Sequence, residues 1–378
     1  MAFAKQGSME NAQHKSNGNI SLENPAPKHR KVNYEFSQNL ADLLLNHNLT
    51  VLVSTYQAGK LAVVGALNDA IALGFHNFDR PMGVATNATR DRLAVAARDR
   101  IWMLKNVPDV ARNLSPETQY DDCWLTRSAL VTGEIQAHEL SWCGDELWVG
   151  NTLFSCLCNP HPNFSFVPRW RPPFISQLAP EDRCHLNGLA CQNGHPKFVT
   201  AMAETDSAGG WRENKISTGC VIDVDSGETV ARGFAMPHSP RLHNQKLWLL
   251  DSGRGSLVCL DPGSGEAEVV GRFPGYTRGL TIVGNLAFVG LSKIRETSTF
   301  GGVTIAEEQQ RLKCGVAVMD LARGSLVGQF EFKSGVDEIF DVSVLTNARM
   351  AAMRGPFAHD DGEQTIWVVP PESESTES

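Results

Sequence analysis

Short apolar segments separated by polar turns make up most of the chain. They are rich in Val, Leu, Trp and Phe, and Gly, Asp or Asn residues lie between them, which is the pattern of β-strands. The segments are "LTVLVSTYQ", "KLAVVGAL", "RLAVAARD", "RIWMLKN", "ELWVGNT", "KFVTAMA", "GCVIDVD", "KLWLLDSG", "SLVCLDP", "NLAFVGLS", "CGVAVMDL", "RMAAMRG" and "TIWVVPP". Many short, evenly spaced strands are typical of a sandwich, a barrel or a propeller.

The two ends of the chain and one helical segment flank this pattern. Only "EFSQNLADLLLNHN" has a helical repeat, in which Ser37 is placed to cap the helix and leucines 40, 43 and 44 share one face. Residues 1–33 and 371–378 are polar and hold too few large apolar groups to fold, so we expect a disordered tail at each end. The folded domain is predicted to span residues 34–370.

Six segments repeat one arrangement, in which a short strand and a polar turn precede a strongly apolar strand. The copies are "RPMGVATNATRDRLAVAARD", "HELSWCGDELWVGNT", "HLNGLACQNGHPKFVTAMA", "HSPRLHNQKLWLLDSG", "RGLTIVGNLAFVGLS" and "EIFDVSVLTNARMAAMRG". They start 58, 47, 53, 40 and 60 residues apart, and a propeller blade needs about 40–50 residues. The sequence therefore predicts an all-β, six-bladed propeller with a short N-terminal helix. Residues 50–74 are expected to close the ring beside the last blade, or to form most of a seventh blade.

The first residue of every copy is chargeable. These residues are Arg80, His138, His185, His238, Arg278 and Glu338. The innermost strand of each blade runs along the central channel, so its first residues lie at the channel mouth. We expect one ring of three histidines, two arginines and one glutamate around a shared central site. The alternative is a wet channel that is polar without having a function.

Three neutral imidazoles that converge on one axis suit a borderline divalent ion. His138, His185 and His238 are therefore expected to bind one transition metal, zinc or iron(II) first, manganese or copper as alternatives. A three-histidine ion keeps open positions, which is typical of catalytic sites. Glu338 would act as general base, complete the ligand set or orient a metal-bound histidine.

The arginines suggest an anionic substrate. Arg80 and Arg278 are expected either to clamp a carboxylate with bidentate hydrogen bonds or to neutralise Glu338. Arg241, three residues after His238, is expected to join them in substrate binding. Acidic residues close to the ring would orient the imidazoles, or else cap strands and pair with arginines; they are Asp79, Glu139, Asp182, Asp337 and Asp341.

Composition excludes some classes of partner. The formal net charge is -8, which argues against nucleic acid, because phosphate binding needs a basic face. No stretch approaches about 20 uninterrupted apolar residues, so no membrane span is expected, and the N-terminus has no apolar signal region. The nine cysteines are an odd number without a spaced framework. We expect reduced thiols in a cytoplasmic protein.

Seven phrases carry a family resemblance: "STYQAGKL", "FDRPMG", "PRWRPPFI", "EDRCHLNGLA", "MPHSPR", "FPGYTRGL" and "VDEIFDV". Together they resemble a bacterial family of conserved hypothetical proteins, some fused to tetratricopeptide repeats, and the resemblance spans about 34–370. It implies no activity. In architecture, the three-histidine channel is similar to the amidating lyase of peptide hormones, a six-bladed zinc propeller, and to the carotenoid-cleaving oxygenases, seven-bladed with four histidines on iron.

These observations give three functional hypotheses. The first is a metal-dependent lyase or hydrolase that acts on a small carboxylate-bearing substrate, with Glu338, Arg80 and Arg278 as catalytic residues. The second is an iron(II) oxygenase that uses the same histidines, hence an oxidoreductase. The third is a non-enzymatic propeller whose faces bind protein partners.

Overall fold

The computed structural model describes residues 31–114, 120–294 and 302–370. Both predicted tails lie outside these residues, except for residues 31–33. The backbone amide of Asn33 donates to Ser334 Oγ at 2.9 Å, and Val32 packs against the core. Val32 and Asn33 therefore contact the folded domain.

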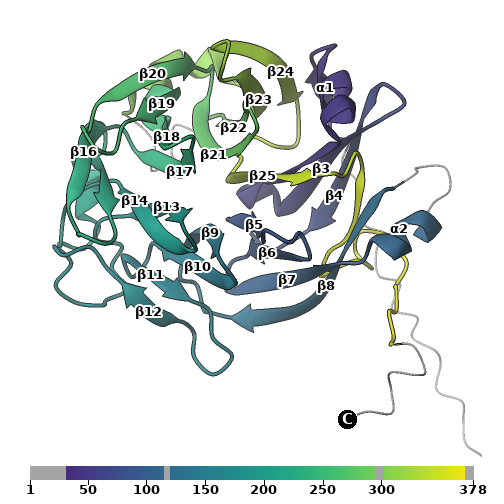
Figure 1. Cartoon of the computed structure of the whole chain (residues 1–378), viewed down its shortest axis with the longest axis horizontal. Helices are drawn as coiled ribbons and strands as arrows, with labels where there is room; N and C mark the ends of the chain where they lie inside the picture. The colour runs from purple at the N-terminus through teal and green to yellow at the C-terminus, as the bar shows by residue number, and fades with distance from the viewer. Residues whose placement is uncertain (1–30, 115–119, 295–301, 371–378) are drawn as a thin grey trace, which may run out of the picture. The chain divides into compact units, whose positions relative to one another are not determined.

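Six β-sheets, antiparallel apart from one strand pair in blade 1, surround a central channel (Figure 1), which confirms the predicted six-bladed propeller. Four blades follow the chain order from the innermost strand outward. Blade 2 is β9 (Ala137–Cys143), β10 (Glu146–Asn151), β11 (Cys156–Asn159) and β12 (Val167–Trp170). Blade 3 is β13 (Leu186–Gln192), β14 (His195–Ala201), β15 (Gly219–Asp223) and β16 (Thr229–Phe234). Blade 4 is β17 (Pro237–His243), β18 (Lys246–Asp251), β19 (Ser256–Leu260) and β20 (Ala267–Arg272). Blade 5 is β21 (Tyr276–Val283), β22 (Leu286–Ser292), β23 (Gly315–Asp320) and β24 (Ser325–Phe332).

The two ends of the chain meet in the remaining blades. In blade 6, the late strand β25 (Asp341–Thr346) is innermost, and β2 (Leu49–Ser54), β3 (Lys60–Leu67) and β4 (Ala70–Asn77) complete the sheet. Strands β2 and β25 pair antiparallel over their full lengths. The N-terminal strands thus close the ring as predicted, and they do not form a seventh blade.

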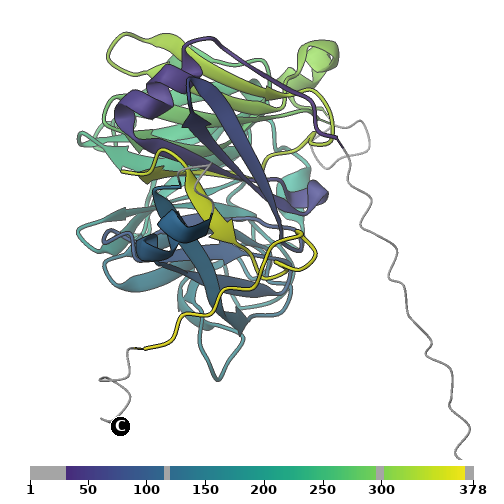
Figure 2. The ribbon, with the colours of Figure 1, turned by 90° about the vertical axis from the view of Figure 1, so that its right-hand side faces the viewer.

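Blade 1 corrects one detail of the repeat. It consists of β5 (Val84–Thr86), β6 (Arg92–Ala96), β7 (Arg100–Asn106) and β8 (Asp122–Val131). The second strand of the sixth repeat, β26 (Ala351–Arg354), leaves its own blade and pairs parallel with β8. Figure 2 shows β26 in yellow beside this part of the ring. The reason is that β2 already occupies the place next to β25.

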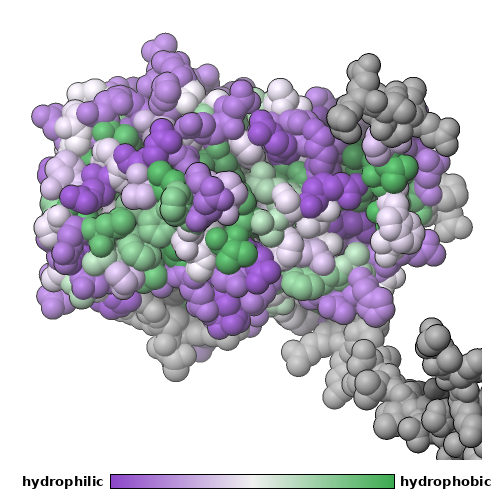
Figure 3. Space-filling view, turned by 90° about the horizontal axis from the view of Figure 1, so that it is seen from below, coloured by the Kyte–Doolittle hydropathy of each residue, from purple (hydrophilic) through white to green (hydrophobic). Residues whose placement is uncertain are grey.

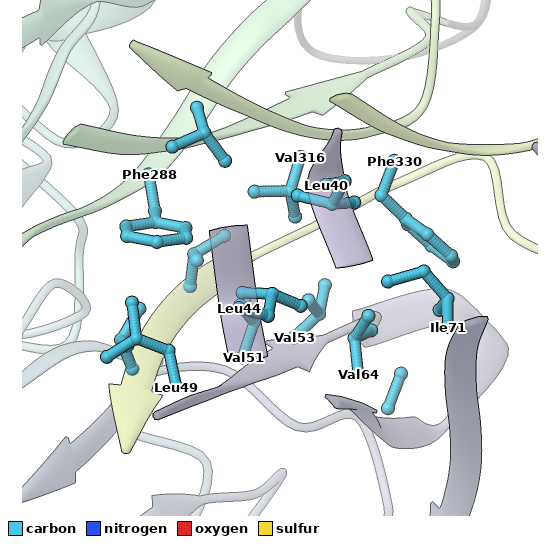
Figure 4. Packing of buried hydrophobic residues seen from close by; sticks show 14 of the residues in the cluster. Leu40, Leu44, Leu49, Val51, Val53, Val64, Ile71, Phe288, Val316 and Phe330 are labelled. Atoms are coloured by element: carbon cyan, nitrogen blue, oxygen red, sulfur yellow. The ribbon is translucent and has the colours of Figure 1, made fainter. Parts of the chain in front are cut away.

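An N-terminal helix seals the junction between blades 5 and 6. Helix α1 (Leu40–His47) buries Leu40 and Leu44 against strands of both blades (Figure 4). Its N-cap is Asn39 and not Ser37, because the Ser37 hydroxyl accepts a hydrogen bond from the backbone amide of Gln329 at 2.9 Å. Strand β1 (Tyr34–Phe36) extends blade 5 by pairing with β24.

The other helical segments lie in connections. In the described residues they are α2 (Pro108–Leu114) and four 3₁₀ helices, η1 (Tyr56–Ala58), η2 (Gly210–Arg212), η3 (Ser252–Arg254) and η4 (Thr304–Arg311). Within the described ranges, no helix is long and apolar enough to cross a membrane. One side of the molecule shows small hydrophobic patches among hydrophilic residues (Figure 3).

Two further predictions from the sequence are wrong. "TIWVVPP" does not form a strand up to residue 370, and Trp367 is 81% exposed. Cys143 and Cys191 form a disulfide between the inner strands of blades 2 and 3, with 5.6 Å between their Cα atoms. The other seven cysteines are free thiols. An odd cysteine count does not reveal such a pair, because the two residues become neighbours only when the blades stack.

The disulfide should stabilise the ring. It closes a loop with a sequence separation of 48, for which the chain-entropy model gives about 4 kcal/mol. We expect the Cys143→Ser, Cys191→Ser double variant to lose up to about that free energy of unfolding in urea titrations. Dithiothreitol should destabilise the wild type by a similar amount and leave the double variant unchanged. Equal stability of wild type and variant without reductant would contradict the disulfide.

Candidate functional site

A cavity of about 420 Å³ opens at one mouth of the channel. Its charged and imidazole-bearing lining residues are Arg80, Glu134, His138, Asp182, His185, Arg212, Arg278, Lys293 and Glu338. Its aromatic lining residues are Tyr56, Trp211, Tyr276 and Phe340. Five of the six residues predicted to form a ring therefore share one cavity. The sixth, His238, is only 3% exposed and contacts the ring of Tyr276, with centroids 5.9 Å apart.

The predicted ring residues do not all occupy one structural position. In blades 2 to 5 the two inner strands are joined by two-residue turns, which begin at Gly144, Asn193, Asn244 and Gly284. Six residues before each turn lie His138, Asn187, His238 and Arg278. Eight residues before it lie Gln136, His185, Met236 and Tyr276. His185 is therefore two residues upstream of the position that His138 and His238 share, so the single aligned position is wrong in register.

The upstream position has an unusual backbone. Gln136, His185 and Met236 have φ values of 53°, 50° and 57°, in the left-handed region that non-glycine residues rarely adopt. In blades 2 and 4 the carbonyls of Gln136 and Met236 accept from Nδ1 of the histidine two residues later, at 3.1 and 2.9 Å. Arg80 has a similar φ of 49° where blade 1 begins. Clustered strain of this kind is typical of functional sites.

His185 is fixed by an acidic partner. Its Nδ1 lies 2.9 Å from Oδ1 of Asp182, and Oδ2 of Asp182 accepts from Nε1 of Trp211 at 2.9 Å. Arg212 reaches the same oxygen at 3.3 Å and stacks on the Trp211 ring. Donation from Nδ1 to a carboxylate leaves Nε2 as the basic nitrogen, which is how acidic groups orient catalytic histidines. This pair confirms that one acidic neighbour, Asp182, supports a histidine.

The other two histidines are neutral. Burial, followed by the positive charge of Arg278, lowers the pKa of His138 and of His238 well below the ordinary histidine value. With Nδ1 occupied by a backbone carbonyl in each, Nε2 carries a free electron pair. Nε2 of His238 is buried and has no hydrogen-bond partner in the part of the chain that the structure describes. The rings of His138 and His185 meet edge to face, 4.8 Å apart.

Arg278 is a buried cation with few partners. It is 4% exposed, and its guanidinium lies 3.3 Å from the centroid of the Phe340 ring. Its nearest carboxylate oxygen belongs to Glu338, 4.0 Å away, and it makes no hydrogen bond to a residue that the structure describes. A guanidinium offers five N–H donors. Arg278 therefore presents unused donors to the cavity.

A second charged layer lies deeper in the channel. Arg241 of blade 4 pairs with Glu139 of blade 2 at 2.7 Å, and Asp341 of blade 6 accepts the amides of Val84 and Val342, each at 2.8 Å. Arg241 is not among the residues that line the cavity, and its part in substrate binding stays a prediction. Among the described residues, Glu139 and Asp341 make no hydrogen bond or ion pair to the three histidines, and they belong to this deeper layer.

The family model described as "Domain of unknown function (DUF4915)" matches residues 38–353. The chain belongs to this family. The match confirms the resemblance to a family without an assigned activity. No curated protein matches the sequence.

Solved structures support the fold alone. One chain of "Crystal structure of Nidogen/Laminin Complex" is similar with a TM-score of 0.51 and 10% identity, over 79% of this chain and 99% of that chain. A protein of unknown function from Bacteroides caccae gives a TM-score of 0.47 and 11% identity, with the same coverages. The first supports a propeller-like architecture and nothing about activity.

The three histidines do not form a tight metal cluster here. Among the described His, Cys, Asp and Glu residues, one group has three ligand atoms within 4.8 Å of one another, and it is His76, Asp361 and Glu363, outside the channel. Metal binding by His138, His185 and His238 therefore stays a prediction.

Several lining residues were missed from the sequence. Trp211 and Arg212 come from η2, in the long connection between β14 and β15, and Lys293 directly follows β22. The repeat could not indicate η2, because the corresponding connections of blades 4 and 5 carry different segments, η3 and η4. Lys293 had a signal, since it stands at the end of a repeated strand. It pairs with Asp337 at 3.4 Å.

The deeper layer should make stability depend on pH. Burial, opposed by the positive charge of Arg241, raises the pKa of Glu139 to about 8 and that of Asp341 to about 6. A group whose pKa is higher in the folded than in the unfolded protein stabilises the fold at pH values below its unfolded pKa. This stabilisation is lost as the pH rises through the pKa of the folded protein. Between pH 5 and 8 the wild type should therefore lose free energy of unfolding, by at most about 1.4 kcal/mol per pH unit for one proton.

Glu139→Gln should flatten this slope in urea titrations across the same range. Glu134→Gln is the control, because Glu134 is exposed at the cavity mouth. Identical slopes in wild type and Glu139→Gln would show that Glu139 holds no proton in this range.

Proposed function

We propose that the channel cavity binds a small carboxylate-bearing molecule and that His185 exchanges a proton with it, in a lyase- or hydrolase-type reaction. The observation that carries this proposal is the buried, under-paired guanidinium of Arg278. Burying a charge without partners is costly, so a partner is expected to enter the site. A carboxylate matches the guanidinium fork with two parallel hydrogen bonds.

The cavity supplies the other groups that such a reaction needs. Arg80 lies at the exposed rim and adds a second cation for the substrate. Asp182 holds the His185 ring with Nε2 as its basic nitrogen, so His185 is the candidate general base. Phe340 and Trp211 provide apolar walls for the carbon skeleton. Glu338, beside Arg278, is the candidate second proton carrier.

Anion binding tests the proposal directly. Small mono- and dicarboxylates such as acetate, malonate and succinate would be titrated calorimetrically against wild type and Arg278→Lys. Lysine keeps the charge but loses the fork, so affinity should fall by about 10- to 100-fold, since a hydrogen bond to a charged group is worth about 1.5–3 kcal/mol. Arg323→Lys is the control, since the Arg323 side chain is 77% exposed.

Glu338→Gln separates the two roles of Arg278. If Arg278 binds the substrate anion, removal of the competing Glu338 charge should preserve or increase affinity. If Arg278 only neutralises Glu338, Arg278→Lys should leave anion affinity unchanged, and that result would overturn the proposal.

A second candidate is the metal-dependent form of the same reaction. In all three histidines Nδ1 forms a hydrogen bond to an oxygen of the protein, which leaves Nε2 as the nitrogen that can bind a metal ion. This arrangement favours the metal-dependent form. His138, His185 and His238 would hold the ion, which would polarise a substrate oxygen or activate water. Elemental analysis of the purified protein distinguishes the two metal-dependent reactions, because zinc is typical of a lyase or hydrolase and iron is typical of an oxygenase.

Metal content in single variants tests this candidate. His138→Ala, His185→Ala and His238→Ala should each lose one equivalent of bound transition metal, because each removes one ligand from a single site. His161→Ala and His195→Ala, which alter exposed or partly exposed histidines outside the cavity, are the controls. Full metal occupancy in all three channel variants would exclude these histidines as ligands.

A further inference from the structure

The segment after β26 is attached to the outer strand of blade 6. Residues 355–370 contain no helix or strand, yet Asp361 accepts the backbone amide of Asn77 at 3.0 Å. Glu363 and Ala358 form a turn in which the amide of Glu363 donates at 2.9 Å. Two distant parts of the sequence, β4 and this C-terminal segment, thus meet through polar side chains.

Three potential metal ligands converge at this contact. One atom each from His76 of β4, Asp361 and Glu363 lies within 4.8 Å of the others, and His76 Nδ1 is 3.5 Å from Glu363 Oε1. An imidazole nitrogen and two carboxylate oxygens form a donor set typical of borderline divalent ions. Calcium and magnesium prefer all-oxygen sites.

Two atoms of this group lack hydrogen-bond partners among the described residues. They are Nδ1 of His76, a residue that is 7% exposed, and the buried Oε2 of Glu363. Two cations lie nearby: Arg354 donates to the other oxygen of Glu363 at 2.9 Å, and Lys60 donates to the side chain of Asn77. Neither cation makes a hydrogen bond to the two partnerless atoms. Buried polar atoms are normally satisfied, so these two indicate a missing ligand.

We propose that His76, Asp361 and Glu363 bind one zinc-like divalent ion that fastens the C-terminal segment to the propeller. Water completes the coordination, and the ion has a structural role. This site is independent of the channel, because its residues lie on the outer strand of blade 6 and beyond β26. The rival explanation is a simple ion pair between a protonated His76 and Glu363.

Limited trypsin digestion of the full chain tests the proposal. Residues 355–378 contain no Lys or Arg, so cleavage after Arg354 releases the whole segment as one fragment that intact-mass spectrometry detects. Protein stripped with a chelator should be cut after Arg354 at least 10-fold faster than protein with one equivalent of Zn(II). Mg(II) and Ca(II) should not protect. Co(II) should give a visible absorption band that Zn(II) removes.

Matched variants lie in the same segment. His76→Ala and Asp361→Asn should abolish protection by Zn(II) and, when combined with His138→Ala, the Co(II) band, with circular dichroism confirming that the fold remains. His359→Ala and Asp360→Asn should behave as wild type, because these side chains are 101% and 69% exposed. His138→Ala should also keep the protection, which separates this site from any metal in the channel.

Three results would overturn the proposal. One is a cleavage rate that does not respond to Zn(II) in the wild type. Another is equal loss of protection in His359→Ala and His76→Ala. The third is equal resistance to trypsin of chelator-stripped and Zn(II)-loaded wild type that is lost in His76→Ala, which is the behaviour of a direct ion pair between His76 and Glu363.

Discussion

The pairing of β2 with β25 holds the ring closed, and the channel depends on it. Six residue pairs, from Leu49 with Thr346 to Ser54 with Asp341, join the two ends of the chain. The Ser54 hydroxyl links this pairing to the neighbouring blade, since it donates to the carbonyl of Met82 at 2.6 Å and accepts the amide of Asp341 at 2.9 Å. This closure joins the N-terminal and C-terminal parts of the chain within blade 6. It also fixes the inner strands of blades 6 and 1 relative to each other.

Closure forces the inner strands close together. A Cβ atom added at Gly83 would lie 2.8 Å from the amide nitrogen of Leu140, so blades 1 and 2 approach as closely as a glycine allows. Below the mouth, Glu139 and Arg241 cross the channel to pair with each other. Polar groups are consequently concentrated in two layers, a self-paired lower layer and an upper cavity in which Arg278 is left without a hydrogen bond to the described residues. This difference between the layers is the physical basis for assigning the function to the upper one.

The number of blades and the closure could be predicted from the sequence, because strand periodicity and the repeated hairpin are local signals. The register of the site could not be obtained by aligning chargeable residues. The two inner strands of each blade pair outward from their two-residue turn, so residues at the same distance from the turn occupy equivalent positions. An alignment on the turns places Asn187, not His185, at the position of His138 and His238.

Other features arise only from tertiary contacts. The disulfide between Cys143 and Cys191, the contribution of Trp211 from a connection, and the meeting of His76 with Asp361 all join residues that no repeat relates. The absence of the predicted strand at residues 365–370 also follows from tertiary contacts. β8 already pairs with β26, and no described strand pairs with these residues.

The role of Arg278 can be observed directly in a crystal structure of the protein grown with millimolar malonate. If the cavity is an anion site, a carboxylate should appear about 3 Å from the guanidinium of Arg278, with its other end toward Arg80 or His185. A cavity that holds only water, with malonate absent or bound elsewhere on the surface, would contradict the assignment of this cavity as the functional site.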